Sequence, residues 1–158
     1  VGMKLYMPKD TFRWGETMAL QDKAGRTRYT VAGEAYSLGK RLHVHDLAGR
    51  EAVYVYQRVP SLFPCYAIEV YGKPVGEITK DLTFFRPRYT MKSLNWEIAG
   101  TLGACDSEIT RQSTVVASSR PQQDVHALTF YDRVTELTAL GVVLAINCVL
   151  APQEPKHL

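Results

Sequence analysis

Much of the chain alternates apolar and polar residues with a period of two. In Leu42–His45 the aliphatic side chains fall on one face and the two histidines on the other, and Tyr66, Ile68 and Val70 repeat this spacing. A period of two with a single apolar face predicts antiparallel strands that cover a core on one side and meet water on the other. Further segments of this kind are Met3–Met7, Thr17–Gln21, Arg28–Ala32, Ala52–Val59, Val75–Lys80, Thr83–Met91, Leu94–Ile98, Ser107–Thr110, Thr114–Ser118 and Val125–Tyr131.

Turn signals separate these segments. The pattern D-x-A-G-R occurs twice, at Asp22–Arg26 and Asp46–Arg50, each time between β-rich arms. Asp at the first position and Gly at the fourth suit a type I turn. Tyr71–Pro74, Gly100–Gly103 and Arg120–Pro121 are further expected turns. Together these signals predict about ten to twelve short strands joined as hairpins, which is typical of a sandwich or a barrel.

The run Leu137–Leu150 has a different character, because it is apolar on every side except at Thr138, Gly141 and Asn147. A surface helix would show a polar face, and a membrane span needs about 20 apolar residues. The run therefore predicts a helix buried on all sides within Val134–Leu150. Asp132 is the expected N-terminal cap, and Pro152 lies just past the end.

A small chain can surround a helix completely only by wrapping a sheet around it. We therefore expect one domain over residues 1–158: a mainly β fold in which about twelve antiparallel strands close into a barrel around the C-terminal helix. Gly141 would allow a strand or its side chain to approach the helix closely, and Asn147 would need a hydrogen-bond partner if it is buried. The side chains expected to be buried on the helix are Leu140, Val143, Leu144 and Ile146.

Four strings in this order resemble the LURP-one-related family, in its bacterial YxjI-like branch: Ser37–Val44, Phe84–Tyr89, Trp96–Gly100 and the closing LGVVLAINCVLA. The likeness covers essentially the whole chain. It implies the Tubby C-terminal-like fold, a twelve-stranded antiparallel barrel around a central helix. Phospholipid scramblases and the phosphoinositide-binding Tubby domains are similar to this family. The resemblance supplies no catalytic residues that could be transferred to this chain.

Composition and charge narrow the function only slightly. The chain has 158 residues and a formal net charge of +3, which permits an anionic partner without requiring one. Its three cysteines are far apart and show neither a disulfide framework nor zinc spacing, so we expect a reducing, cytoplasmic compartment. The first ten residues lack the long apolar segment of a signal peptide. No sequence fingerprint indicates a cofactor, a metal or a catalytic motif.

The candidate ligand site is a basic face that consists of Lys80, Phe84, Arg86, Arg88 and Lys92. In one continuous extended strand these residues would share a face, with Phe85 and Tyr89 opposite. Two outward arginines at i and i+2 can bind phosphate oxygens, so the face suggests anionic phospholipid head groups at a membrane surface. The simpler interpretation is a solvent-exposed strand face whose cations prevent an edge strand from pairing with another chain. Nucleic-acid binding and an enzyme of unknown class are the alternatives to a non-catalytic lipid-binding module.

Three other groups have simple structural explanations. His43, His45 and Asp46 have metal-ligand chemistry but no further ligand at a suitable spacing, so solvent-facing histidines are favoured. Tyr54 and Tyr56 share one strand face, as barrel packing requires. Trp14 and Phe63 fall in expected loops, where they either fold back over a barrel end or insert into a membrane or a partner.

Overall fold

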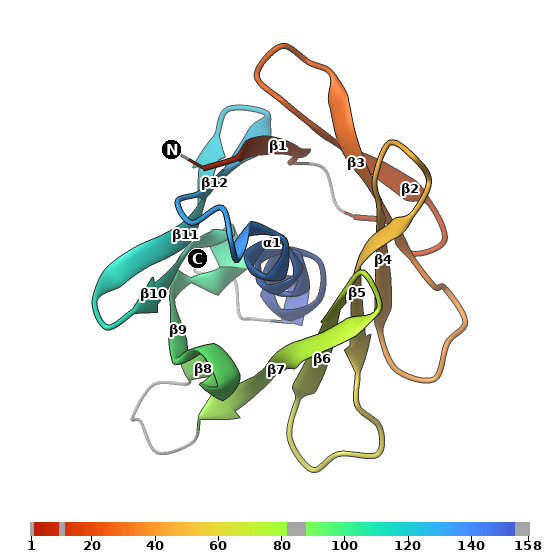
Figure 1. The fold of residues 1–158 in the computed structure, drawn as a ribbon. Helices are drawn as coiled ribbons and strands as arrows, with labels where there is room; N and C mark the ends of the chain where they lie inside the picture. The colour runs from red at the N-terminus through yellow and green to blue at the C-terminus, as the bar shows by residue number, and fades with distance from the viewer. Residues whose placement is uncertain (1, 10–11, 82–87, 154–158) are drawn as a thin grey trace.

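The computed structural model describes residues 2–9, 12–81 and 88–153 of the chain. These residues form twelve strands and one long helix, with the helix inside the ring of strands (Figure 1). The strands are β1 (Lys4–Pro8), β2 (Thr17–Gln21), β3 (Thr27–Gly33), β4 (Arg41–His45), β5 (Glu51–Gln57), β6 (Cys65–Val70), β7 (Lys73–Asp81), β8 (Arg88–Met91), β9 (Trp96–Thr101), β10 (Asp106–Arg111), β11 (Thr114–Gln122) and β12 (Val125–Phe130).

Every strand pairs antiparallel with its neighbours in sequence, and β1 pairs with β12 to close the barrel. The closing ladder runs from Lys4 opposite Thr129 to Pro8 opposite Val125. Closure removes the exposed sheet edges that an open sheet would leave. The predicted twelve-stranded antiparallel barrel is therefore confirmed.

The barrel is filled by one helix, which starts as α1 (Glu136–Leu144) and continues as a π-helical segment over Ala145–Leu150 and a 3₁₀ turn over Ala151–Gln153. All residues from Thr138 to Ala151 are buried. Inward side chains of the strands, such as Leu42, Val53 and Ile98, form the rest of the same core. The predicted burial of Leu140, Val143, Leu144 and Ile146 is confirmed.

Gly141 is the point of closest approach between helix and wall. A Cβ atom at this position would lie 2.9 Å from Cγ1 of Val53 and 3.0 Å from Cγ2 of Ile68. The two aliphatic side chains thus occupy the space that any larger residue would need. The predicted close approach at Gly141 is confirmed, and it comes from the side chains of β5 and β6.

Three boundary predictions are wrong. The helix begins at Glu136 and not at Val134, which is exposed. Asp132 lies in the turn before the helix, where its carboxylate accepts hydrogen bonds from the Val134 amide and the Thr135 hydroxyl. Leu94 ends a 3₁₀ turn (Lys92–Leu94) and is not part of a strand.

The expected turn at Arg120–Pro121 is also wrong, because both residues lie within β11. Pro121 comes after Ser119, the last residue of β11 in register with β10. Its missing N–H therefore interrupts no bond between these two strands.

Because the strands alternate in direction, the two ends of the barrel differ. One end, called here the turn end, carries the tight turns at Asp22–Arg26, Asp46–Arg50 and Tyr71–Gly72. In both D-x-A-G-R turns the Asp carboxylate accepts bonds from the amides two and four residues later, as in Asp46 with Ala48 at 2.9 Å and Arg50 at 3.0 Å. The other end, called the long-loop end, carries the connections over residues 34–40 and 58–64.

Candidate functional site

The predicted basic face is divided in the structure. Phe84 and Arg86 lie outside the described residues. Lys80 is in register with the buried Tyr89 across β7 and β8, and Arg88 is in register with Asp81. Opposite residues of an antiparallel pair share a face, so Lys80 lies on the inward face and Arg88 on the outward face. The expectation that Lys80 is in phase with Arg88 is therefore wrong.

The remaining two cations of that face lie apart. Arg88 starts β8 at the long-loop end, where its guanidinium lies 3.8 Å from the Glu97 carboxylate. Lys92 begins the 3₁₀ turn after β8, at the turn end. A strand rises about 3.3 Å per residue, so the two Cα atoms are about 13 Å apart. The outward, exposed position predicted for Arg88 is confirmed, whereas Lys92 is exposed in the 3₁₀ turn and not on the strand.

A different surface gathers at the long-loop end. The loops over residues 34–40 and 58–64 carry large apolar side chains that are exposed. Tyr36 is fully exposed, Leu38 is 81% exposed and Leu62 is 89% exposed. We call the exposed apolar side chains of these two loops the apolar tip: Tyr36, Leu38, Val59, Leu62 and Phe63.

The two loops that carry the apolar tip are packed against each other. A Cβ atom on Gly39 would lie 3.3 Å from Cγ1 of Val59, so the backbone of one loop touches a side chain of the other. The Gln57 amide donates to the Lys40 carbonyl at 2.8 Å, and the Lys40 amide donates to Oε1 of Gln57 at 3.1 Å. The two hairpins that carry the tip are thus in contact at their bases.

Each loop contains a hydrogen bond from a serine hydroxyl to a backbone carbonyl of the same loop. The Ser37 hydroxyl donates to the Gly39 carbonyl at 2.6 Å, and the Ser61 hydroxyl donates to the Phe63 carbonyl at 2.6 Å. Each loop therefore holds its own shape without burying its leucine. Large apolar side chains held exposed in this way mark a surface that is suited to a partner or a membrane.

Basic side chains flank the apolar tip. Nζ of Lys40 lies 4.9 Å from the centre of the Trp14 ring. Arg41 lies 3.9 Å from Glu34, and Arg58 forms an ion pair with Glu77 and lies over the Tyr56 ring. The long-loop end thus combines apolar side chains with cations at their base.

Trp14 and Phe63 follow the two different expectations for loop aromatics. Trp14 folds back over the barrel end, where it packs edge-to-face on Phe12 at 5.2 Å and covers Gly33. Phe63 stays 48% exposed beside Leu62. The sequence indicated the Phe63 loop because its apolar residues stand between two prolines. It missed Tyr36 and Leu38, whose loop has the Gly and Ser content of an ordinary turn.

His43 stands on the outer face of the barrel in a cluster that the sequence did not predict. Its Nδ1 lies 2.5 Å from a Glu51 carboxylate oxygen, and its Nε2 lies 2.8 Å from one of Glu34. The ring stacks on Tyr54 at 4.8 Å, and Tyr54 stacks on Tyr56 at 5.0 Å. Val53 and Val55 are buried on the inner face, as expected.

The carboxylates set the protonation of His43. Partial burial lowers the pKa of the imidazole, but the hydrogen bonds that the protonated ring donates to the Glu34 and Glu51 carboxylates outweigh this effect, so the pKa is raised above the ordinary value. His43 is therefore no simple solvated histidine. No group of three or more His, Cys, Asp or Glu side chains that could hold a metal occurs within residues 2–9, 12–81 and 88–153.

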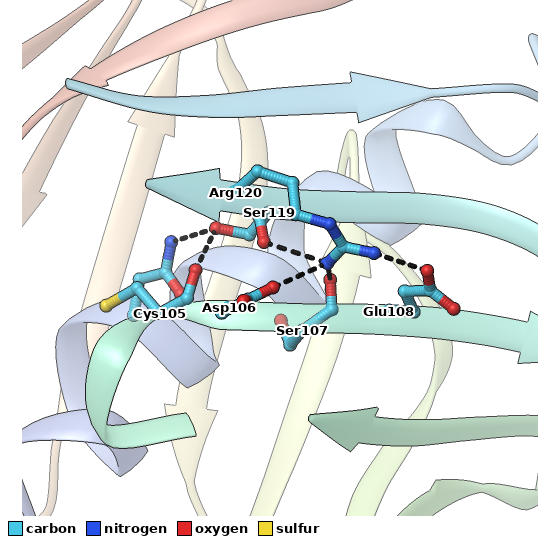
Figure 2. A network of polar contacts seen from close by, with 7 residues as sticks. Cys105, Asp106, Ser107, Glu108, Ser119 and Arg120 are labelled. Carbon is cyan, nitrogen blue, oxygen red and sulfur yellow. Dashed lines mark hydrogen bonds and ion pairs between the residues drawn. The ribbon is translucent and has the colours of Figure 1, made fainter. Parts of the chain in front are cut away.

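A second polar network ties the helix to the wall (Figure 2). The Arg120 guanidinium donates to Asp106 at 2.9 Å, to the Ser107 carbonyl at 2.8 Å and to the Glu108 carboxylate. The adjacent Ser119 hydroxyl donates to the Cys105 carbonyl at 2.8 Å.

Asn147 of the helix completes this network, because its amide Nδ2 donates to the Ser119 oxygen at 3.1 Å. The partner predicted for Asn147 is thus found. Since the hydrogen bonds of this network join residues of the barrel and the helix to one another, we interpret it as structural.

The cysteines show no activated thiol. Cys148 is buried in the helix, as expected, and burial raises the pKa of its thiol. Burial is also the main cause that raises the pKa of the Cys65 thiol to about 11, with its hydrogen bond to Glu77 as the second cause. Both groups remain thiols at neutral pH, and a thiol is a poor nucleophile.

A closed twelve-stranded antiparallel barrel around a buried C-terminal helix is the class of protein that these features define. The chain belongs to the LURP-one-related family, whose model matches residues 3–147. It is 33% identical over 108 residues to YxjI of Bacillus subtilis (strain 168), an uncharacterised protein, across 68% of this chain and 67% of that one.

The X-ray structure of the Arabidopsis thaliana protein AT5G01750 has a similar fold. The TM-score is 0.62, the identity is 10%, and the alignment covers 91% of this chain and 90% of that one. This likeness concerns the fold alone. Within the described part of the chain, no helix is long and apolar enough to cross a bilayer.

Proposed function

We propose that this protein is a non-catalytic binding module that docks from the cytoplasm on anionic phospholipid head groups, with the apolar tip facing the membrane. The observation that carries the proposal is the apolar tip with its cations: Leu38 and Leu62 are almost fully exposed, next to Lys40 and Arg58. Interfacial binding of this kind requires apolar side chains at the acyl boundary and cations at the level of the head groups.

Neither contribution is large by itself. Full transfer of a leucine side chain out of water contributes about 1.5–3 kcal/mol. A cation near an anionic surface contributes about 1 kcal/mol. Binding that needs both contributions should be reversible and should depend on both the salt concentration and the charge of the lipid.

The test is co-sedimentation of the full chain with phosphatidylcholine vesicles that contain or lack phosphatidylserine. We expect the protein to bind the anionic vesicles preferentially. The double variant Leu38→Ser with Leu62→Ser should weaken binding by at least about tenfold, because ~1.4 kcal/mol corresponds to a factor of ten. Leu47→Ser is the matched control, since Leu47 is 74% exposed in a turn at the opposite end.

Charge is tested in the same way. Lys40→Gln should weaken binding to the anionic vesicles, whereas Lys23→Gln, in an exposed turn at the turn end, should not. Arg88 is a cation of the sequence-predicted face that the structure places outward, and the variant Arg88→Glu tests its contribution to vesicle binding. The proposal is overturned if the wild-type protein does not bind anionic vesicles. It is also overturned if the Leu38/Leu62 double variant binds them as strongly as wild type does. A steeply salt-dependent gel shift with nucleic acid would then favour the nucleic-acid alternative.

A further inference from the structure

The two ring nitrogens of His43 both face carboxylate oxygens, Glu51 at 2.5 Å and Glu34 at 2.8 Å. A neutral imidazole has one N–H and one bare nitrogen, whereas the imidazolium has two N–H donors. Only the protonated ring can therefore donate to both carboxylates. Its neutral form must leave one carboxylate facing a lone pair.

Glu34 connects this cluster to the apolar tip. It is the first residue of the 34–40 loop, and its amide donates to the Arg41 carbonyl at 3.1 Å to close that loop. The Ser37 hydroxyl lies 3.4 Å from the Glu34 carbonyl. The charge on Glu34 thus stands at the base of Tyr36 and Leu38, on the side of the barrel that would meet an anionic surface.

The other charged and titratable groups around His43 come from three strands. On its own strand Arg41 lies 3.9 Å from Glu34, and the titratable His45 lies two residues away on the same outward face. β5 contributes Glu51 and Tyr54, and Tyr54 is in register with Glu69 of β6. The carboxylates therefore exceed the cations around the ring, and His43 supplies the adjustable positive charge of the cluster.

We propose that His43 is a proton-operated latch for the apolar tip: its imidazolium neutralises Glu34 and Glu51, and loss of the proton exposes an uncompensated carboxylate at the base of the 34–40 loop. The latch rests on the proposed membrane function, since it regulates that same site. Binding to anionic lipid is stronger with the latch protonated and weakens as the pH rises through the pKa of His43. One charge near a lipid surface contributes about 1 kcal/mol, which corresponds to a change of about fivefold in binding.

The latch itself is tested without lipid, by NMR titration of the His43 ring in the full chain. We expect a midpoint above that of an ordinary histidine. Glu51→Gln should lower this midpoint, because the amide removes one carboxylate and can donate to the neutral ring. A midpoint that is unchanged in Glu51→Gln overturns the latch.

The functional arm is co-sedimentation with phosphatidylserine-containing vesicles as a function of pH. Wild-type binding should drop by about fivefold across the midpoint measured by NMR. His43→Phe keeps a ring on Tyr54 but has no N–H, so it should lose this step. Glu51→Gln should move the step to lower pH. His45→Asn, on the same strand, is the matched control and should retain the step.

The outcomes separate the two proposals. If His43→Phe and wild type have the same pH profile, the latch fails while membrane docking stands. If wild type binds no anionic vesicles at any pH, the docking proposal fails, and the latch as a regulator of that docking fails with it. The NMR midpoints of wild type and Glu51→Gln still decide whether the protonated His43 ring bonds to both carboxylates.

Discussion

The amide Nδ2 of Asn147 on the central helix lies 3.1 Å from the Ser119 hydroxyl oxygen on β11 and donates a hydrogen bond to it. The Ser119 hydroxyl in turn donates a hydrogen bond to the Cys105 carbonyl. Within the described residues, the other amide atom, Oδ1 of Asn147, is buried and has no hydrogen-bond partner. Asn147 is therefore a buried polar contact between the helix and the wall.

Ser119→Ala should destabilise the protein, because it leaves the Asn147 amide group and the Cys105 carbonyl without their partner. An unsatisfied buried polar group costs about 1–3 kcal/mol. The measurement is a double-mutant cycle: thermal unfolding of wild type, Ser119→Ala, Asn147→Leu and the double variant. The double variant should lose less than the sum of the single losses, since it removes both partners together. Strict additivity would show that the bond contributes nothing.

Gly141→Ala should also destabilise the protein, although alanine favours a helix by up to ~1 kcal/mol over glycine. The added methyl would lie within about 3 Å of Val53 and Ile68, and overpacking of a core costs about 1–3 kcal/mol. The measurement is the free energy of unfolding in urea. In a Val53→Ala background the loss should shrink. A stabilised Gly141→Ala protein would contradict the close packing.

Leu144→Asp should abolish folding, because Leu144 is fully buried and an unpaired carboxylate in the core has a prohibitive desolvation cost. The readout is the yield of folded protein and its thermal transition. Leu47→Asp, in an exposed turn, is the control and should melt as wild type does. A Leu144→Asp variant with a wild-type melting curve would refute the buried helix.

Arg120→Lys should lower the melting temperature even though the charge is kept. The guanidinium bridges Asp106, Glu108 and two backbone carbonyls, and an ammonium cannot span that set. Because the side chain is 40% exposed, we expect a modest loss of about 1 kcal/mol. Arg111→Lys, an exposed position on β10, should cause no change.

The His43 cluster predicts a pH-dependent contribution to stability. The folded-state pKa of His43 is raised above its unfolded value. Its stabilising contribution is therefore fully present below the unfolded pKa and is lost as the pH rises through the folded pKa. Melting temperatures of wild type and His43→Phe, measured from acidic to alkaline pH, should differ most below that window and converge above it. A constant difference would show that the ring matters only by packing.

The fold was largely determined by the sequence alone. Alternation such as that of Leu42–His45 reports a half-buried strand wherever it occurs, because side chains of a strand alternate between its faces. The run Leu137–Leu150 can avoid water only inside the barrel. These are local consequences of burying apolar side chains, and they need no knowledge of which strands pair.

The surfaces were decided by tertiary structure. Lys80 and Arg88 are separated by an even number of residues, so they would share a face in one continuous strand. They lie on adjacent strands instead, and the cross-strand register places Lys80 opposite the inward Tyr89. The apolar tip joins Leu38 and Leu62 from hairpins that are side by side only in the closed barrel. His43 likewise meets Glu34 and Glu51 across strands. Register and loop packing depend on long-range pairing, which a local pattern of residues does not encode.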